Sequence, residues 1–289
     1  MSFSKISQIL QTAETQNKPF WQIILEDDCL ERNVTQKESF SKMEQMLDAM
    51  ISADKNYNPK LRSQSGLSGG EGAKLEKFRK QKNRLIGTFL TMVMEKAVKM
   101  GETNACMGRI VASPTAGSCG VIPAVLLTYL EQKNPPKEKI VQSLYVAAGI
   151  GQVIAETASI SGAQGGCQAE IGSASSMAAG AITFLEDGTN GQIANAAALA
   201  MKNMLGLTCD PVAGLVEIPC IKRNVSGAVN AIIASQMTLA GINSAIPADE
   251  VFEAMGRIGS LLPVCLRETS QDGLASTPTA QKLSKQLKK

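Results

Sequence analysis

The stretch TQKESFSKMEQMLDAMI, residues 35–51, carries the pattern that decides the fold class. Thr35 and Glu38 precede an apolar run and predict a capping box at the start of a helix. Behind them the apolar side chains recur at the spacing of one helix face. These side chains are Phe40, Met43, Met46, Leu47, Met50 and Ile51. The stretch therefore predicts a long helix with one buried face.

The chain on either side of this stretch also favours helices over strands. Segment 52–73, which includes SGLSGGEG at 65–72, is predicted to be a loop, and a second long helix is expected over about 74–100. Beyond residue 101, short helical patterns alternate with turns rich in glycine, serine and proline. They predict helices at roughly 120–132, 137–157, 174–186, 190–205, 226–243 and 248–258. Only RIVASP at 109–114 is compatible with a short strand.

We therefore predict a mainly α fold, with residues 1–289 in a single helical domain. Within it, residues 1–73 form a helical N-terminal part and a loop. Residues 274–289 form a basic tail that is expected to be frayed. The Gly/Ser/Pro-rich loops of the second half are the expected place for chemistry, because functional side chains gather on loops that a rigid scaffold positions.

The composition restricts the functional classes. Of the 289 residues, 44% are apolar and 19% are charged, which provides a sizeable core and argues against disorder. A net charge of +3, without a basic stripe, gives no indication of nucleic-acid binding. No run of about 18 apolar residues indicates a membrane span, and the polar N-terminus is unlike a signal peptide, so we expect a cytoplasmic protein. Histidine is absent, which excludes a Ser–His or Cys–His mechanism within this chain.

Three of the seven cysteines lie in turn-like backbone beside glycine or proline. They are Cys167, in GGCQAE, and Cys209 and Cys220, in the rigid and apparently non-helical stretch GLTCDPVAGLVEIPCIKRN at 206–224. Backbone of this kind can curl around inorganic sulfide and present a thiolate to a cluster. Because the chain has no Cys-x-x-Cys pair, the spacing alone favours small buried residues over cluster ligands.

Five blocks of sequence, in order along nearly the whole chain, point to a known family. They are LSGGEGAK at 67–74, SPTAGSCGVIPAVL at 113–126, GGCQAEIGSASSMAAG at 165–180, LTCDPVAGLVEIPCIKRN at 207–224 and ETSQDGLASTPT at 268–279. With these blocks the chain resembles the α subunit of the iron–sulfur-dependent L-serine dehydratases. Asp272 departs from the pattern, since a second glycine is expected there, and this affects the local loop rather than the resemblance.

The resemblance implies a catalytic domain that degrades L-serine to pyruvate and ammonia, a carbon–oxygen lyase reaction that feeds gluconeogenesis. It also implies a 4Fe–4S cluster held by Cys167, Cys209 and Cys220. Three thiolates leave one iron without a protein ligand, and such an iron is a Lewis acid toward the β-hydroxyl of serine. Cys119 and Cys265 are interpreted as packing residues.

Five residues are candidates for substrate binding. Ser113, Thr115 and Ser118, in SPTAGS ahead of a predicted helix, are expected to hold the substrate carboxylate together with backbone N–H groups. Lys222 and Arg223 follow Cys220 and are expected beside the cluster or on the same carboxylate. A lysine there is a poor general base, because the negative charge of the cluster favours its protonated form.

The sequence leaves the general base unknown. Since histidine is absent, we expect the base from a partner chain. Glu170 and Asp210 flank the cysteines, but structural capping is favoured over proton transfer for both.

The resemblance further implies a β subunit. Single-chain relatives join this catalytic part to a regulatory α/β domain that is lacking here, so we expect a hetero-oligomer such as a heterodimer. The C-terminus carries no cysteine tail, and no fourth cluster ligand is expected from it. Three alternatives stay open: a cysteine desulfidase with a related cluster, a non-catalytic iron–sulfur sensor, and a helical interaction subunit with buried thiols.

Overall fold

The computed structural model describes residues 2–82 and 84–287. These residues form thirteen α-helices and no strand beyond one isolated bridge, which confirms the mainly α prediction. The helices are α1 (Ile6–Gln16), α2 (Phe20–Arg32), α3 (Gln36–Lys55), α4 (Glu71–Arg79), α5 (Thr88–Ala105), α6 (Val121–Lys133), α7 (Lys137–Thr157), α8 (Gly162–Gly165), α9 (Ser173–Leu185), α10 (Asn190–Lys202), α11 (Cys220–Leu239), α12 (Ala248–Leu261) and α13 (Pro278–Leu287). Among them, none has both the length and the apolar character that a bilayer crossing requires.

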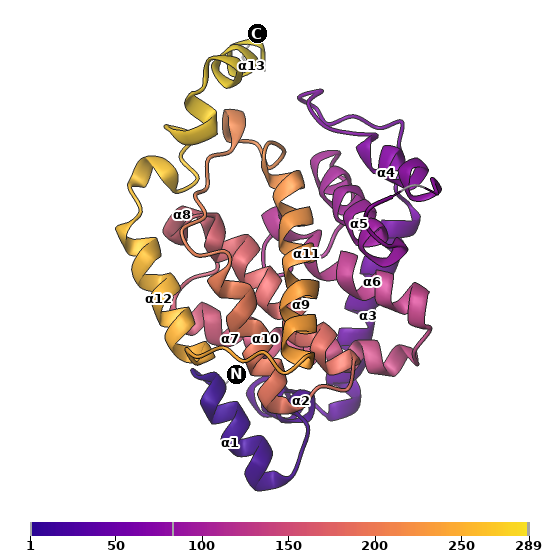
Figure 1. The fold of residues 1–289 in the computed structure, drawn as a ribbon, viewed down its shortest axis with the longest axis vertical. Helices are drawn as coiled ribbons and strands as arrows, with labels where there is room; N and C mark the ends of the chain where they lie inside the picture. Colours follow the sequence, from indigo (N-terminus) through magenta and orange to yellow (C-terminus); the bar gives the residue numbers. More distant parts are fainter. Residues whose placement is uncertain (1, 83, 288–289) are drawn as a thin grey trace.

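Helix α9 lies in the middle of the molecule and forms the centre of the core (Figure 1). It packs against α7, α10 and α11, and every residue of α9 except Phe184 is buried. A helix that is covered on all sides needs small residues where its neighbours approach closely. Gly180 is such a residue, because a Cβ atom there would overlap the side chain of Ile150 in α7.

Two local predictions are confirmed in detail. The Thr35 hydroxyl accepts a hydrogen bond from the Glu38 N–H at 3.2 Å, and Glu38 Oε2 accepts one from the Thr35 N–H at 2.9 Å, so the capping box forms at the start of α3. Helix α7 occupies the predicted residues 137–157, directly after the sequence Asn134-Pro135-Pro136.

Three elements differ from their predictions. The helix expected over 74–100 is two helices, α4 and α5. Residues 80–84 are all polar and offer no apolar face to pack, and α5 begins after Gly87. RIVASP at 109–114 is irregular, since no strand in the described part of the chain offers it backbone hydrogen bonds. Helix α13 forms where a frayed tail is expected, although most of its residues are exposed.

Ion pairs hold the short helix α4 against α5. Arg79 of α4 pairs with Glu95 of α5 at 2.7 Å, and Lys99 of α5 reaches Glu95 at 2.7 Å and Glu76 of α4 at 3.3 Å. The only fully buried residue of α4 is Gly72. The attachment of α4 therefore relies on charge more than on apolar burial.

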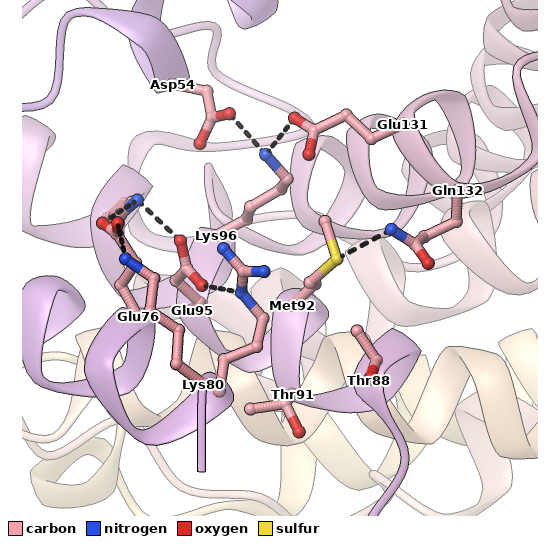
Figure 2. A network of polar contacts seen from close by, with 12 residues as sticks. Asp54, Glu76, Lys80, Thr88, Thr91, Met92, Glu95, Lys96, Glu131 and Gln132 are labelled. Carbon is pink, nitrogen blue, oxygen red and sulfur yellow. Dashed lines mark hydrogen bonds and ion pairs between the residues drawn. The ribbon is translucent and has the colours of Figure 1, made fainter. Parts of the chain in front are cut away.

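Two further ion pairs, both made by Lys96, lie deeper. The Lys96 ammonium of α5 sits between Asp54 Oδ2 of α3, at 2.5 Å, and Glu131 Oε1 of α6, at 2.6 Å (Figure 2). Lys96 is only 5% exposed. One buried cation thus joins three helices of the N-terminal half.

Candidate functional site

A tight turn brings Cys167 beside Cys209. Gly166 has a φ of +75°, a region that favours glycine, and a Cβ atom there would meet the Leu207 carbonyl. The Gln168 N–H donates to that carbonyl at 3.0 Å, so the Cys167 segment lies along the chain that leads to Cys209. The Cys209 thiol donates to the Cys167 sulfur, which lowers the pKa of Cys167 and raises the pKa of Cys209.

Cys220 is the first residue of α11 and is buried. The prediction of non-helical backbone at Cys220 is therefore wrong, and α11 begins well before the predicted start at 226. Pro219 stands at the N-cap, where its missing N–H costs nothing. Burial, together with the negative charges of Cys167 and Glu170, raises the pKa of Cys220 to about 12. Cys167 thus affects the pKa of both Cys209 and Cys220, and all three predicted cluster cysteines are buried.

Asn224 joins the start of α11 to the SPTAGS loop. Its Nδ2 donates to the carbonyls of Cys220 at 2.9 Å and Gly117 at 2.8 Å. Its Oδ1 accepts from the Gly120 N–H at 2.8 Å. Because Asn224 is 1% exposed, these bonds fix the predicted substrate loop beside Cys220.

Two carboxylates lie next to Cys209. The backbone of Cys209 pairs with that of residues 266–268: its N–H donates to Leu266, and its carbonyl accepts from the Glu268 N–H at 2.7 Å. One sulfur and two carboxylate oxygens, from Cys209, Glu170 and Glu268, lie within 4.8 Å of one another. A Cβ atom on Gly162 would lie 2.9 Å from Glu170 Oε2 and 3.2 Å from Cys209 Sγ, so the group lines a space that only glycine leaves open.

The SPTAGS loop faces this group through Thr115. The Thr115 hydroxyl donates to Glu170 Oε1 at 2.6 Å. Burial raises the pKa of Glu170, and the charge of Glu268 adds to the effect, although the Thr115 hydrogen bond opposes it. The Ser113 hydroxyl is buried without a hydrogen-bond partner, whereas Ser118 bonds back to Thr115. Their contact with substrate stays a prediction.

The two basic candidates differ in position. Arg223 pairs with the buried Asp210 at 2.8 Å and donates to the Thr208 carbonyl at 2.8 Å, and its charge helps to lower the pKa of Cys167. Lys222 pairs instead with Glu71 at the start of α4, and its side chain is 55% exposed. The structure therefore brings Arg223 to the cysteines and turns Lys222 toward the neighbouring loop.

Sequence reasoning missed Glu268 and Asn224, and it favoured only a capping role for Glu170. Glu268 comes to Cys209 through a long-range bridge, for which the local sequence carries no signal. Asn224 stands four residues after Cys220, and this helical spacing was hidden because the start of α11 was misplaced.

The donor set suits a sulfur-rich iron group. The Cys209 thiol and two carboxylates border the space at Gly162, and Cys167 and Cys220 are buried in the same region. Arg223 interacts with Cys167. Thiolates are the ligands of iron–sulfur clusters, and the cationic inorganic core, before its thiolates are counted, would offset the negative charge of these side chains. Of the three cysteines, Cys209 is the one in the tight group with both carboxylates, and Cys167 and Cys220 would supply the other two thiolates.

Comparisons with known proteins show which family the chain is similar to. Residues 15–275 match the family model described as serine dehydratase alpha chain. The chain is 45% identical over 285 residues to a probable L-serine dehydratase alpha chain of Bacillus subtilis, covering 99% of this chain and 95% of that one. It is 38% identical to the L-serine dehydratase alpha chain of Peptoniphilus asaccharolyticus, covering 98% and 97%. An L-serine dehydratase of Helicobacter pylori is 35% identical, and the match covers 95% of this chain but 62% of that longer protein.

Proposed function

Since the chain belongs to the serine dehydratase alpha-chain family, we propose that it is the catalytic alpha subunit of an L-serine ammonia-lyase, which converts L-serine to pyruvate and ammonia. The observation that carries the proposal is the convergence of Cys167, Cys209 and Cys220 with Glu170 in one buried region. Family membership favours serine over cysteine as substrate, and the adjacent carboxylates favour a catalytic centre over an iron–sulfur sensor.

Cys167, Cys209 and Cys220 would hold the 4Fe–4S cluster. When bound, the cluster supplies an iron without a protein thiolate, a Lewis acid for the departing hydroxyl of serine. Cluster binding requires thiolates, and the surroundings of Cys167 favour its deprotonated form. Cys167 has a lowered pKa because Cys209 donates to it and Arg223 lies near.

The SPTAGS loop would hold the substrate. The buried Ser113 hydroxyl has no partner within the described protein, so a polar group of the substrate would satisfy it. Arg223 is held by Asp210, and its positive charge favours an anionic carboxylate nearby. Thr115 keeps Glu170 oriented toward Cys209. An open cleft of about 750 Å³ borders the site on its Glu268 side and offers a route for a small amino acid.

Glu170 is our candidate for proton transfer in this chain. Burial raises its pKa, which makes its carboxylate a stronger base than an exposed glutamate. It accepts one hydrogen bond from Thr115 and keeps further lone pairs for a substrate proton.

Chemical analysis and turnover test the proposed function together. The chain, purified without air and supplied with its β subunit, is expected to contain about four iron and four sulfide and to form pyruvate from L-serine. If the protein releases sulfide from L-cysteine faster than it forms pyruvate from L-serine, the result would support the desulfidase. A cluster without turnover of either substrate would support the sensor. A chain that neither contains nor accepts iron would leave the helical interaction subunit.

Glu170→Gln is expected to lower kcat for L-serine by about 100-fold or more while iron and sulfide contents stay unchanged, because the amide cannot accept the proton. Glu268→Gln is the matched control, since it changes the neighbouring carboxylate, and its kcat is expected to fall less. If Glu170→Gln retains most of its activity, the base comes from the β subunit.

We also propose that the partner is this β subunit and that the assembly works in the cytoplasm. Two relatives are named alpha chain, and the H. pylori protein extends beyond the match. Both facts support the presence of a second subunit beside this chain. The free state of all seven cysteines agrees with a reducing compartment.

A further inference from the structure

The Gly-rich stretch at 65–72 belongs to an ordered loop. We call residues 63–71 the serine loop. The Ser63 N–H donates to the Ser68 carbonyl at 3.0 Å, and the Gly66 N–H donates to the Ser63 carbonyl at 2.9 Å. Ser63 and Ser68 are 5% and 4% exposed. The loop therefore packs against another part of the protein.

That other part is Glu217, in the segment between Cys209 and Cys220. Ser63 Oγ donates to Glu217 Oε2 at 2.7 Å, and Ser65 Oγ donates to Glu217 Oε1 at 2.7 Å. Glu217 is 5% exposed, so both bonds are sheltered from water. The carbonyl of Glu217 also accepts from the Ile221 N–H at 3.1 Å, which places this carboxylate at the start of α11.

The C-terminal end of the loop also contacts the start of α11. Glu71 pairs with Lys222, in the first turn of α11. The N–H groups of Glu71 and Gly72 donate to the buried Glu102 of α5, at 2.7 and 3.1 Å. Residues 63–71 thus lie along residues 217–222, and their contacts lie on both sides of Cys220.

We propose that Glu217 is a positioning residue that docks the serine loop onto the start of α11 and thereby holds Cys220 in its ligand position. The proposal rests on the proposed function for the role of Cys220. Glu217 accepts from both serines, whereas its hydrogen bonds in the described part of the chain do not include Cys167, Cys209 or Cys220. Its effect on the site is therefore indirect.

Cleavage by trypsin in the cluster-free protein tests the docking. Arg62 directly precedes the buried Ser63, so cutting after Arg62 requires the loop to leave Glu217. In Glu217→Ala the cut is expected to be at least about tenfold faster, because two charge-assisted bonds are lost. Glu217→Gln keeps one acceptor oxygen and is expected to give an intermediate rate.

Asp27→Ala is the matched control. Asp27 of α2 is also a buried carboxylate that accepts from a serine hydroxyl, but its partner is Ser2 Oγ, at 2.5 Å, near the N-terminus of the chain. This variant is expected to leave the cut after Arg62 unchanged. If Glu217 acts through the two serines, adding Ser63→Ala and Ser65→Ala to Glu217→Ala should change the rate of cleavage after Arg62 little further.

The effect on Cys220 has a separate readout, the loss of visible cluster absorption in air. Glu217→Ala is expected to lose it several-fold faster than the unchanged chain, and Asp27→Ala at the unchanged rate. Faster cleavage with unchanged cluster loss would overturn the link to Cys220. Unchanged cleavage would overturn the docking itself. Absence of a cluster from the unchanged chain would refute the proposed function instead, and the cleavage result would still stand.

Discussion

Cys209→Ala is expected to abolish pyruvate formation from L-serine and to prevent stable cluster binding. Cys209 lies at the centre of the site: it donates to Cys167, and its sulfur is within 4.8 Å of oxygens of Glu170 and Glu268. Its removal takes away one of three thiolates, and alanine offers no lone pair in its place. Iron and acid-labile sulfide, together with pyruvate release, measure the result in anaerobically purified protein.

Cys119→Ala separates this effect from the loss of a buried thiol. Cys119 is 1% exposed, and its contact with the Met100 carbonyl, at 3.9 Å, is weak. Burial raises the pKa of Cys119 to about 12, and none of the three proposed ligand cysteines contributes to that shift. The control is expected to lose about 1 kcal/mol of stability and to keep cluster and activity. A Cys209→Ala protein with four irons and normal turnover would remove Cys209 from the ligand set.

Local patterns in the sequence predicted the helices with clear apolar faces and clear caps. The Thr35–Glu38 box and the helix at 137–157 depend on neighbours in sequence, and both formed as expected. The start of α11 was misplaced because its first turn, CIKRN, carries charges and has no apolar periodicity. Tertiary bonds of Asn224 stabilise that turn instead.

In the site, too, some features could be predicted from the sequence and others depend on tertiary contacts. The three cysteines followed from the family resemblance, whereas their surroundings depend on contacts between distant segments. Glu268 reaches Cys209 through a backbone bridge, and the N–H groups of Glu71 and Gly72, at the end of the Gly-rich loop, donate to Glu102 of α5. A single sequence holds no local sign of either contact.

Lys96→Met is expected to lower the free energy of unfolding by about 3–5 kcal/mol, because it leaves a buried carboxylate without its cation. Asp54 Oδ1 already lacks a hydrogen-bond partner, and Oδ2 loses the ammonium at 2.5 Å. Urea unfolding of the cluster-free chain, followed by far-UV circular dichroism, measures the loss. Combining Asp54→Leu with Lys96→Met removes both charges, so the double variant should be more stable than Lys96→Met alone.

Lys137→Met isolates the contribution of burial. Lys137 also pairs with two carboxylates, Glu44 at 3.0 Å and Asp48 at 2.7 Å, but its side chain is 41% exposed. Water therefore screens these pairs, and the loss is expected to stay below about 1 kcal/mol. Equal losses in the two variants would contradict the argument. A larger loss for Lys96→Met would show that the buried Lys96 ammonium stabilises the packing of α5. The same helix carries Glu102, which accepts hydrogen bonds from the end of the serine loop.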